Sequence, residues 1–347
     1  MMLNKLGTHF FANKVAVDRA PDRFSYKPPS DTTPLLFSAT PPKKSSSRLS
    51  NDAGNDDTCA PTSQSFKLRF EKNLRQLEKY TDALPSSLKS TKQIRDESKQ
   101  SYQVMTETEI SFLRENTSTT RTETMMEKLL KGSEFAAMID KKTGGFLDPN
   151  TGLCCQLQRL DSGNYALCIP GIAPGKTFGT QLSASIQQFL GVGGVPEIYS
   201  QALNLAEFLN EKLKAEGKNL ELSGHSMGGG IANYVGLKLD LPSVCFNAAA
   251  LGRACLKDIG EVSPKTLEKQ IHIRMENDFA THPPVTRKLQ AFFYLGREKY
   301  IPRNVGVICE IKSSDPFYPS NRGIMDRHLL DAMDDWYKQL HFSRVFG

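Results

Sequence analysis

The fold is decided by the stretch Asn219-Leu-Glu-Leu-Ser-Gly-His-Ser-Met-Gly-Gly-Gly-Ile-Ala-Asn-Tyr234. Alternating leucines at its start predict a short strand, and the residues from Gly229 onward have helical spacing. Between them, residues 224–228 have the G-x-S-x-G pattern of a nucleophile elbow, a sharp turn that exposes a serine hydroxyl. This pattern predicts that Ser226 is a nucleophile and that the N–H of Met227 faces the developing oxyanion. The alternative is a tight glycine-rich turn in which the serine has no chemical role.

Three further residues complete the predicted elbow: Gly224, His225 and Gly228. We expect glycine at both ends because a Cβ there would collide with the neighbouring strand or helix. His225 is the variable residue of the pattern, and we expect its side chain to point away from the oxyanion side.

The composition indicates a protein with a sizeable core and a mild charge. Of 347 residues, 39% are hydrophobic, and the formal net charge is +6 with Lys and Arg scattered among Asp and Glu. Nucleic acid is therefore not the expected partner, whereas weak attraction to an anionic membrane surface stays open. No window reaches the roughly 18 uninterrupted apolar residues of a membrane span.

The cysteines predict neither a zinc site nor structural disulfides. There are seven, without C-x-x-C spacing. Three of them, Cys168, Cys245 and Cys309, lie inside apolar runs, where a free thiol behaves as a small buried hydrophobe.

The chain divides into three predicted parts: a disordered leader (1–64), a helical segment (65–143) and a catalytic domain (144–347). The leader is rich in Pro, Ser, Thr, Asn and Asp and cannot bury enough apolar surface to fold. It is either a leader for export without a cleaved signal, as in injected bacterial effectors, or a passive tail of a cytoplasmic protein, or an organelle transit peptide.

The helical segment contains a sequence typical of a helix start, because Thr120-x-x-Glu123 matches a capping box. These helices either cover the core of the protein or bind a lipid or a host protein.

The catalytic domain begins with two predicted strands, residues 153–160 and 164–169, joined as a hairpin. The second strand runs into a glycine-rich loop, and we expect the N–H of Ile172 to be the second oxyanion donor. Residues 177–195 then predict a short amphipathic helix, through Leu182, that is either a mobile cover or an ordinary packed helix.

Three further strands are expected after the elbow, at residues 243–247, 271–275 and 305–311. Asp278 follows the second of them, and His328 precedes a predicted helix over 329–340. This chain order of serine, acid and histidine is that of an α/β-hydrolase, which predicts an α/β fold with a mostly parallel sheet flanked by helices. His282 and Asp315 are the rival base and acid, whereas His272 lies in mid-strand, where a packed core role is expected.

Several motifs together resemble those of the class 3 (fungal-type) lipases. Residues 224–229 are similar to the G-H-S-L-G-G elbow with Met for Leu, and residues 277–278 to the N-D acid motif. Residues 291–301 resemble the aromatic segment that follows, and His328 resembles the histidine at a helix start. Residues 169–172 stand where the family has F-R-G-T, but Pro and Ile replace Arg and Thr, which leaves only a backbone oxyanion donor.

The resemblance implies hydrolysis of acylglycerol or phospholipid esters through an acyl-enzyme at Ser226. It implies no metal or cofactor, a lipid substrate at a membrane surface, and a layout like that of some bacterial effectors. Two other hypotheses stay open: an esterase or thioesterase with a soluble substrate, and a silent hydrolase-fold module that binds a host protein through its N-terminal helices.

Overall fold

The computed structural model of the chain describes residues 89–113, 122–172, 178–190, 193–276 and 302–345, with single positions at 68, 71, 72, 278 and 281. All of these residues belong to one compact unit. The predicted leader (1–64), the rival base His282 and the aromatic segment 291–301 lie outside the described residues.

A mostly parallel sheet forms the centre of this unit, which confirms the predicted α/β class. Within the described residues it has seven strands, which follow one another in chain order. The pairs β1–β2 and β2–β3 are antiparallel, and the pairs from β3 to β7 are parallel. The strands are β1 (Phe146–Leu147), β2 (Cys154–Arg159), β3 (Tyr165–Ile169), β4 (Leu220–His225), β5 (Ser243–Phe246), β6 (Gln270–Met275) and β7 (Val307–Ile311).

The sheet separates two hydrophobic cores, because successive side chains of a strand point to opposite faces. In β3, Leu167 and Ile169 belong to one core, and Ala166 and Cys168 belong to the other. The apolar run of β3 is thus buried on both faces, as expected for a central parallel strand.

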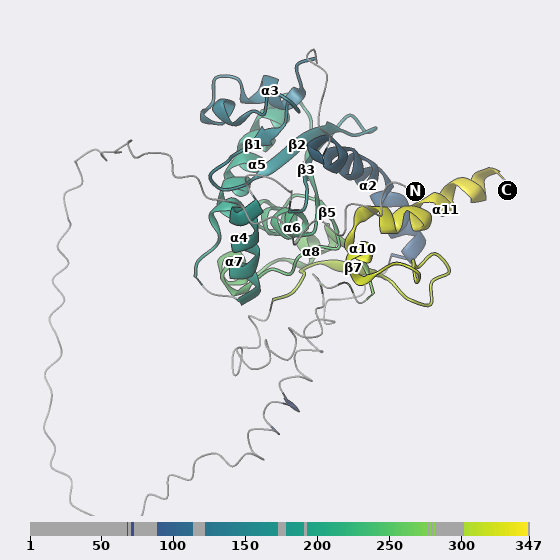
Figure 1. Cartoon of the computed structure of the whole chain (residues 1–347). Helices are drawn as coiled ribbons and strands as arrows, with labels where there is room; N and C mark the ends of the chain where they lie inside the picture. The colour runs from purple at the N-terminus through teal and green to yellow at the C-terminus, as the bar shows by residue number, and fades with distance from the viewer. Residues whose placement is uncertain are drawn as a thin grey trace, which may run out of the picture. The chain divides into compact units, whose positions relative to one another are not determined.

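Helices cover both faces (Figure 1). The first core includes side chains of α5 (Glu197–Ala215) and α6 (Met227–Leu239). The second includes side chains of α2 (Thr91–Leu113) and α11 (Asp334–Val345). The other helices in the described part of the chain are α3 (Met125–Leu130), η2 (Glu134–Met138), α4 (Phe178–Leu190), α7 (Arg253–Ile259), α8 (Pro264–Glu268), α10 (Ile324–His328) and η4 (Leu330–Met333).

The capping box lies four residues later than predicted. Thr124, not Thr120, is the N-cap of α3, and it exchanges hydrogen bonds with Glu127. Both positions carry a T-x-x-E sequence, but only the second directly precedes the buried face of Met126, Leu129 and Leu130. Burial of that face therefore decides which of the two boxes starts the helix.

The position of His328 also differs from the prediction. It is the last residue of α10 and does not head the following helix, which begins only at Asp334 after the 3-10 turn η4. The physical reason is that Leu329 has extended backbone angles, φ −70° and ψ 150°, which separate α10 from η4.

In the described part of the chain, no helix is both long enough and apolar enough to cross a membrane.

Candidate active site

Ser226 occupies a strained turn between β4 and α6. Its φ of 54° and ψ of −121° lie outside the regions that non-glycine residues favour. Main-chain hydrogen bonds hold this conformation: Ser226 N–H donates to Phe246 at 3.0 Å, and its carbonyl accepts from Ala249 at 2.8 Å and Gly230 at 3.2 Å. Strain that the surrounding structure enforces in this way is typical of functional turns.

The two elbow glycines are required by close backbone approach. A Cβ on Gly224 would lie 2.3 Å from the carbonyl oxygen of Gly228, and one on Gly228 would lie 2.0 Å from that of Ile169. Both distances are far below contact distance, so β3, β4 and α6 meet here only because these positions lack side chains.

The structure brings Ser226, His328 and Asp278 together. Nε2 of His328 lies 2.7 Å from Oγ of Ser226, and its Nδ1 lies 2.7 Å from Oδ2 of Asp278. Ser226 follows β4, Asp278 follows β6, and His328 is the last residue of α10. Serine and histidine are 102 positions apart in the chain, and histidine and aspartate are 50 positions apart. An imidazole held between a hydroxyl and a carboxylate can remove the hydroxyl proton while the carboxylate fixes its tautomer.

Asp278 is almost fully buried, with 1% of its surface exposed. Its Oδ1 accepts a hydrogen bond from the N–H of Thr281 at 3.0 Å, while Oδ2 faces His328. Both oxygens are therefore occupied, which fixes the carboxylate.

The main chain of His328 is held as firmly as its ring. Its carbonyl oxygen lies 2.8 Å from Nε2 of His225 and accepts from Nδ2 of Asn247 at 3.0 Å. These partners come from the ends of β4 and β5, so the histidine is tied to the same sheet edge as the serine.

The glycine-rich loop after β3 passes directly beside the serine. A Cβ on Gly171 would lie 3.2 Å from Cβ of Ser226, and the half-buried Ile172 follows. Met227, the other expected oxyanion donor, is the first residue of α6 and is buried. The loop beyond Ile172 lies outside the described residues.

The ring of His225 lies between the glycine-rich loop and α2. Its Nδ1 lies 3.3 Å from the Cβ position of Gly171 and 2.6 Å from Oε1 of Glu109. The carboxylate of α2 draws the ring toward the loop, and this partner could not be identified from the elbow pattern.

His225 is buried and Glu109 is partly buried, and each shifts the pKa of the other. Burial alone would raise the pKa of Glu109, but attraction to His225 and the hydrogen bond between them lower it below its usual range. Burial would likewise lower the pKa of His225, and the same attraction to Glu109 raises it instead. Both directions favour a carboxylate paired with an imidazolium.

Glu109 and Asn247 are the site residues that sequence reasoning missed. The available signal for Glu109 is its helical spacing from Met105 and Tyr102, which are buried, because it places a carboxylate on the buried face of α2. For Asn247 the signal is an asparagine directly after a strand, where it adopts φ 41°.

The described rival residues have other partners. His272 is buried, and its Nε2 lies 3.3 Å from the carbonyl oxygen of Val305, in agreement with a core role. Asp315 accepts from the N–H of Phe317 at 2.9 Å in the turn after β7.

The helix α4 is held by buried amides, which the apolar pattern did not predict. Gln181 donates to the carbonyl of Gly152 at 2.7 Å, and Gln188 accepts from the N–H of Gly252 at 2.6 Å. Leu182, which is on the expected apolar face of this helix, is 39% exposed.

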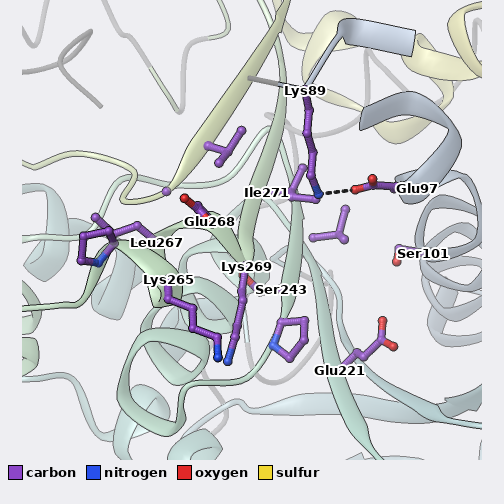
Figure 2. A pocket seen from close by; sticks show the side chains of 15 residues that line it. Lys89, Glu97, Ser101, Glu221, Ser243, Lys265, Leu267, Glu268, Lys269 and Ile271 are labelled. Carbon is purple, nitrogen blue, oxygen red and sulfur yellow. Dashed lines mark hydrogen bonds and ion pairs between the residues drawn. The ribbon is translucent and has the colours of Figure 1, made fainter. Parts of the chain in front are cut away.

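A pocket of about 850 Å³ lies at the end of the parallel strands opposite to Ser226 and Asp278 (Figure 2). Its lining includes Glu221, Ser243, Ile271 and Val307, which stand at the beginnings of four strands, whereas Ser226 and Asp278 follow strand ends. It is therefore separate from the candidate active site. Among the described residues, no group of three or more His, Cys, Asp and Glu side chains could hold a metal ion.

Comparison with known proteins adds a chemical class to this geometry. A family model described as phospholipase-like, a Tle-like phospholipase domain, matches residues 175–274. The match includes the elbow and ends before Asp278. The match supports a lipase- or phospholipase-type hydrolase with a lipid substrate. It does not confirm the resemblance of the motifs to those of the class 3 lipases. A comparison with curated proteins gives no match.

Proposed function

We propose that this chain is a serine carboxylester hydrolase that cleaves acyl esters of phospholipids or acylglycerols. One observation carries the proposal: the hydroxyl of Ser226 and the carboxylate of Asp278 lie on opposite nitrogens of His328, each at 2.7 Å. The strained turn at Ser226 and the phospholipase-like match support it.

In the proposed reaction, Oγ of Ser226 attacks the ester carbonyl carbon while its proton passes to Nε2 of His328. The tetrahedral oxyanion is stabilised by the backbone N–H groups of Met227 and Ile172. Collapse breaks the ester C–O bond, and the proton moves from His328 to the departing alkoxide. Water then attacks the acyl-enzyme, with His328 as base, and releases the fatty acid and Ser226.

Two exposed apolar side chains close to the base in sequence favour a lipid over a soluble ester. Met325 is 66% exposed and Leu329 is 48% exposed, and they flank His328 in sequence. Exposed large apolar side chains next to a site support contact with a membrane surface.

The test uses phospholipid vesicles, short soluble esters and a fluorophosphonate probe. We expect fatty-acid release from vesicles, weak turnover of soluble esters, and probe labelling that Ser226→Ala abolishes. Turnover of only soluble esters or thioesters would favour the alternative esterase. If Ser226→Ala leaves hydrolysis unchanged, the serine mechanism is wrong. If the wild type hydrolyses none of these substrates and the probe does not label it, a silent module that binds a host protein is favoured.

We further propose that the chain is an exported effector, with residues 1–64 as leader, 65–143 as a helical segment and 144–347 as the catalytic domain. The composition of the leader supports this setting. The contacts of α2 with the sheet support a segment that extends the core. Deletion of residues 1–64 is expected to abolish export and to leave vesicle hydrolysis intact.

A further inference from the structure

A single carboxylate oxygen connects α2 with two parts of the candidate site. Oε1 of Glu109 lies 2.6 Å from Nδ1 of His225 and accepts from the N–H of Gly171 at 3.3 Å. Glu109 thus contacts both the elbow and the loop that carries Ile172. Its side chain is 21% exposed and that of His225 is 5% exposed, so water competes little for these bonds.

The other nitrogen of His225 holds the main chain of the base. Nε2 faces the carbonyl oxygen of His328 at 2.8 Å, and a carbonyl can only accept, so Nε2 carries a proton. Facing the ionised Glu109, Nδ1 carries one as well. The ring is then an imidazolium that donates in both directions, and Glu109 neutralises a charge that would otherwise be costly to bury.

We propose that Glu109 and His225 are a positioning pair that keeps the Gly171–Ile172 loop and the main chain of His328 in register with Ser226. The inference rests on the proposed serine mechanism and assigns part of the active site to a helix of the N-terminal segment. Such positioning matters because a displacement of about 1 Å can cost about 100-fold in rate.

The direct test is Glu109→Gln, which preserves size but not charge. One atom, Oε1, makes both contacts, and the amide atom that replaces it cannot serve both when Nε2 keeps its proton. An oxygen there accepts from Gly171 but faces the lone pair of a neutral Nδ1, and an NH2 there donates to Nδ1 but opposes the N–H of Gly171. We expect kcat for vesicle hydrolysis to fall about 10- to 100-fold, as for other outer partners of catalytic groups. KM should stay within about twofold of the wild-type value, because the altered contacts are not contacts with the bound substrate. The rate of fluorophosphonate labelling should fall in parallel with kcat.

The matched control is Glu107→Gln, an exposed residue on the same helix. Its kcat and labelling rate should equal those of the wild type.

A double variant separates positioning from stability. Glu109→Met with His225→Leu removes both buried charges together, so its free energy of unfolding should exceed that of His225→Leu alone. Its kcat should nevertheless stay as low as that of the worse single variant. Recovery of kcat together with stability would show that the pair is only structural and would overturn the proposal.

The two proposals fail in distinguishable ways. If Ser226→Ala hydrolyses vesicles like the wild type, the serine mechanism fails and the positioning pair fails with it. If Ser226→Ala is inactive but Glu109→Gln matches Glu107→Gln, only the positioning pair is wrong.

Discussion

Asn247 donates its amide to the main-chain oxygen of His328 at 3.0 Å, while its own oxygen accepts from Met275 N–H at 2.8 Å. One buried side chain at the end of β5 thus connects the segment that carries the proposed base to β6, the strand that precedes Asp278. This relation predicts that Asn247 supports catalysis without touching the substrate.

Asn247→Asp keeps the acceptor but turns a carboxylate oxygen toward the carbonyls of Arg327 and His328. We expect kcat for vesicle hydrolysis to fall about 10- to 100-fold. The control is Asn233→Asp, because the buried amide of Asn233 also both donates and accepts. It donates to the carbonyl oxygen of Val305 and accepts from the N–H of Val305. The control variant should lower stability and leave the kcat of the folded fraction unchanged. Equal kcat losses in the two variants would contradict the role of Asn247.

Gly228→Ala should destabilise the protein and abolish activity, because its Cβ would overlap the main-chain oxygens of Ile169 and Pro170. Neither oxygen can move without displacing β3, so we expect a loss of about 3 kcal/mol or more in the free energy of unfolding. Gly179→Ala in α4 has open space around the new methyl group and should gain up to about 1 kcal/mol. Urea unfolding of both variants measures the difference, and similar midpoints would contradict the elbow packing.

His272 should make the fold less stable in mild acid. Burial lowers its pKa from 6.5 to about 4. As pH falls below 6.5, the unfolded chain binds a proton that the folded state excludes, so stability decreases until about pH 4. This residue alone should cost about 2 kcal/mol between pH 7 and pH 5. In His272→Leu the fall over that range should be smaller by this amount, and an identical pH dependence would disprove the assignment.

The cysteines should resist thiol reagents in the native state. All six described cysteines are free and buried, and burial raises the pKa of Cys154, Cys168, Cys245 and Cys255 to about 12. A thiolate is the reactive form, so Ellman's reagent should label at most one of the seven thiols before unfolding and all seven in guanidinium. Rapid labelling of two or more in the native protein would contradict the described core.

The α/β class was predictable because apolar residues alternate in β4 and recur with helical spacing in α6. Between the two lies a serine with a glycine two positions away on each side. The mostly parallel sheet was predictable because apolar runs such as β3 are buried on both faces, as in a central parallel strand. The candidate acid and base could be named because Asp278 follows a strand and His328 follows the last one.

Other features depend on tertiary contacts that no local pattern records. Glu109 meets His225 across 116 residues of chain, and nothing in the elbow indicates a charged partner. The start of α3 could not be placed from the sequence because two T-x-x-E sequences follow one another and only burial decides between them. The end of α10 at His328 depends on the extended conformation of Leu329.

The backbone of Ser226 has a practical consequence. Three main-chain hydrogen bonds, to Phe246, Gly230 and Ala249, hold its unusual φ, and none of them uses the hydroxyl. Removing that oxygen should therefore leave the turn intact. Ser226→Ala would then be a substrate trap, a protein that still captures the intact lipid and so allows the uncleaved ligand to be identified by mass spectrometry.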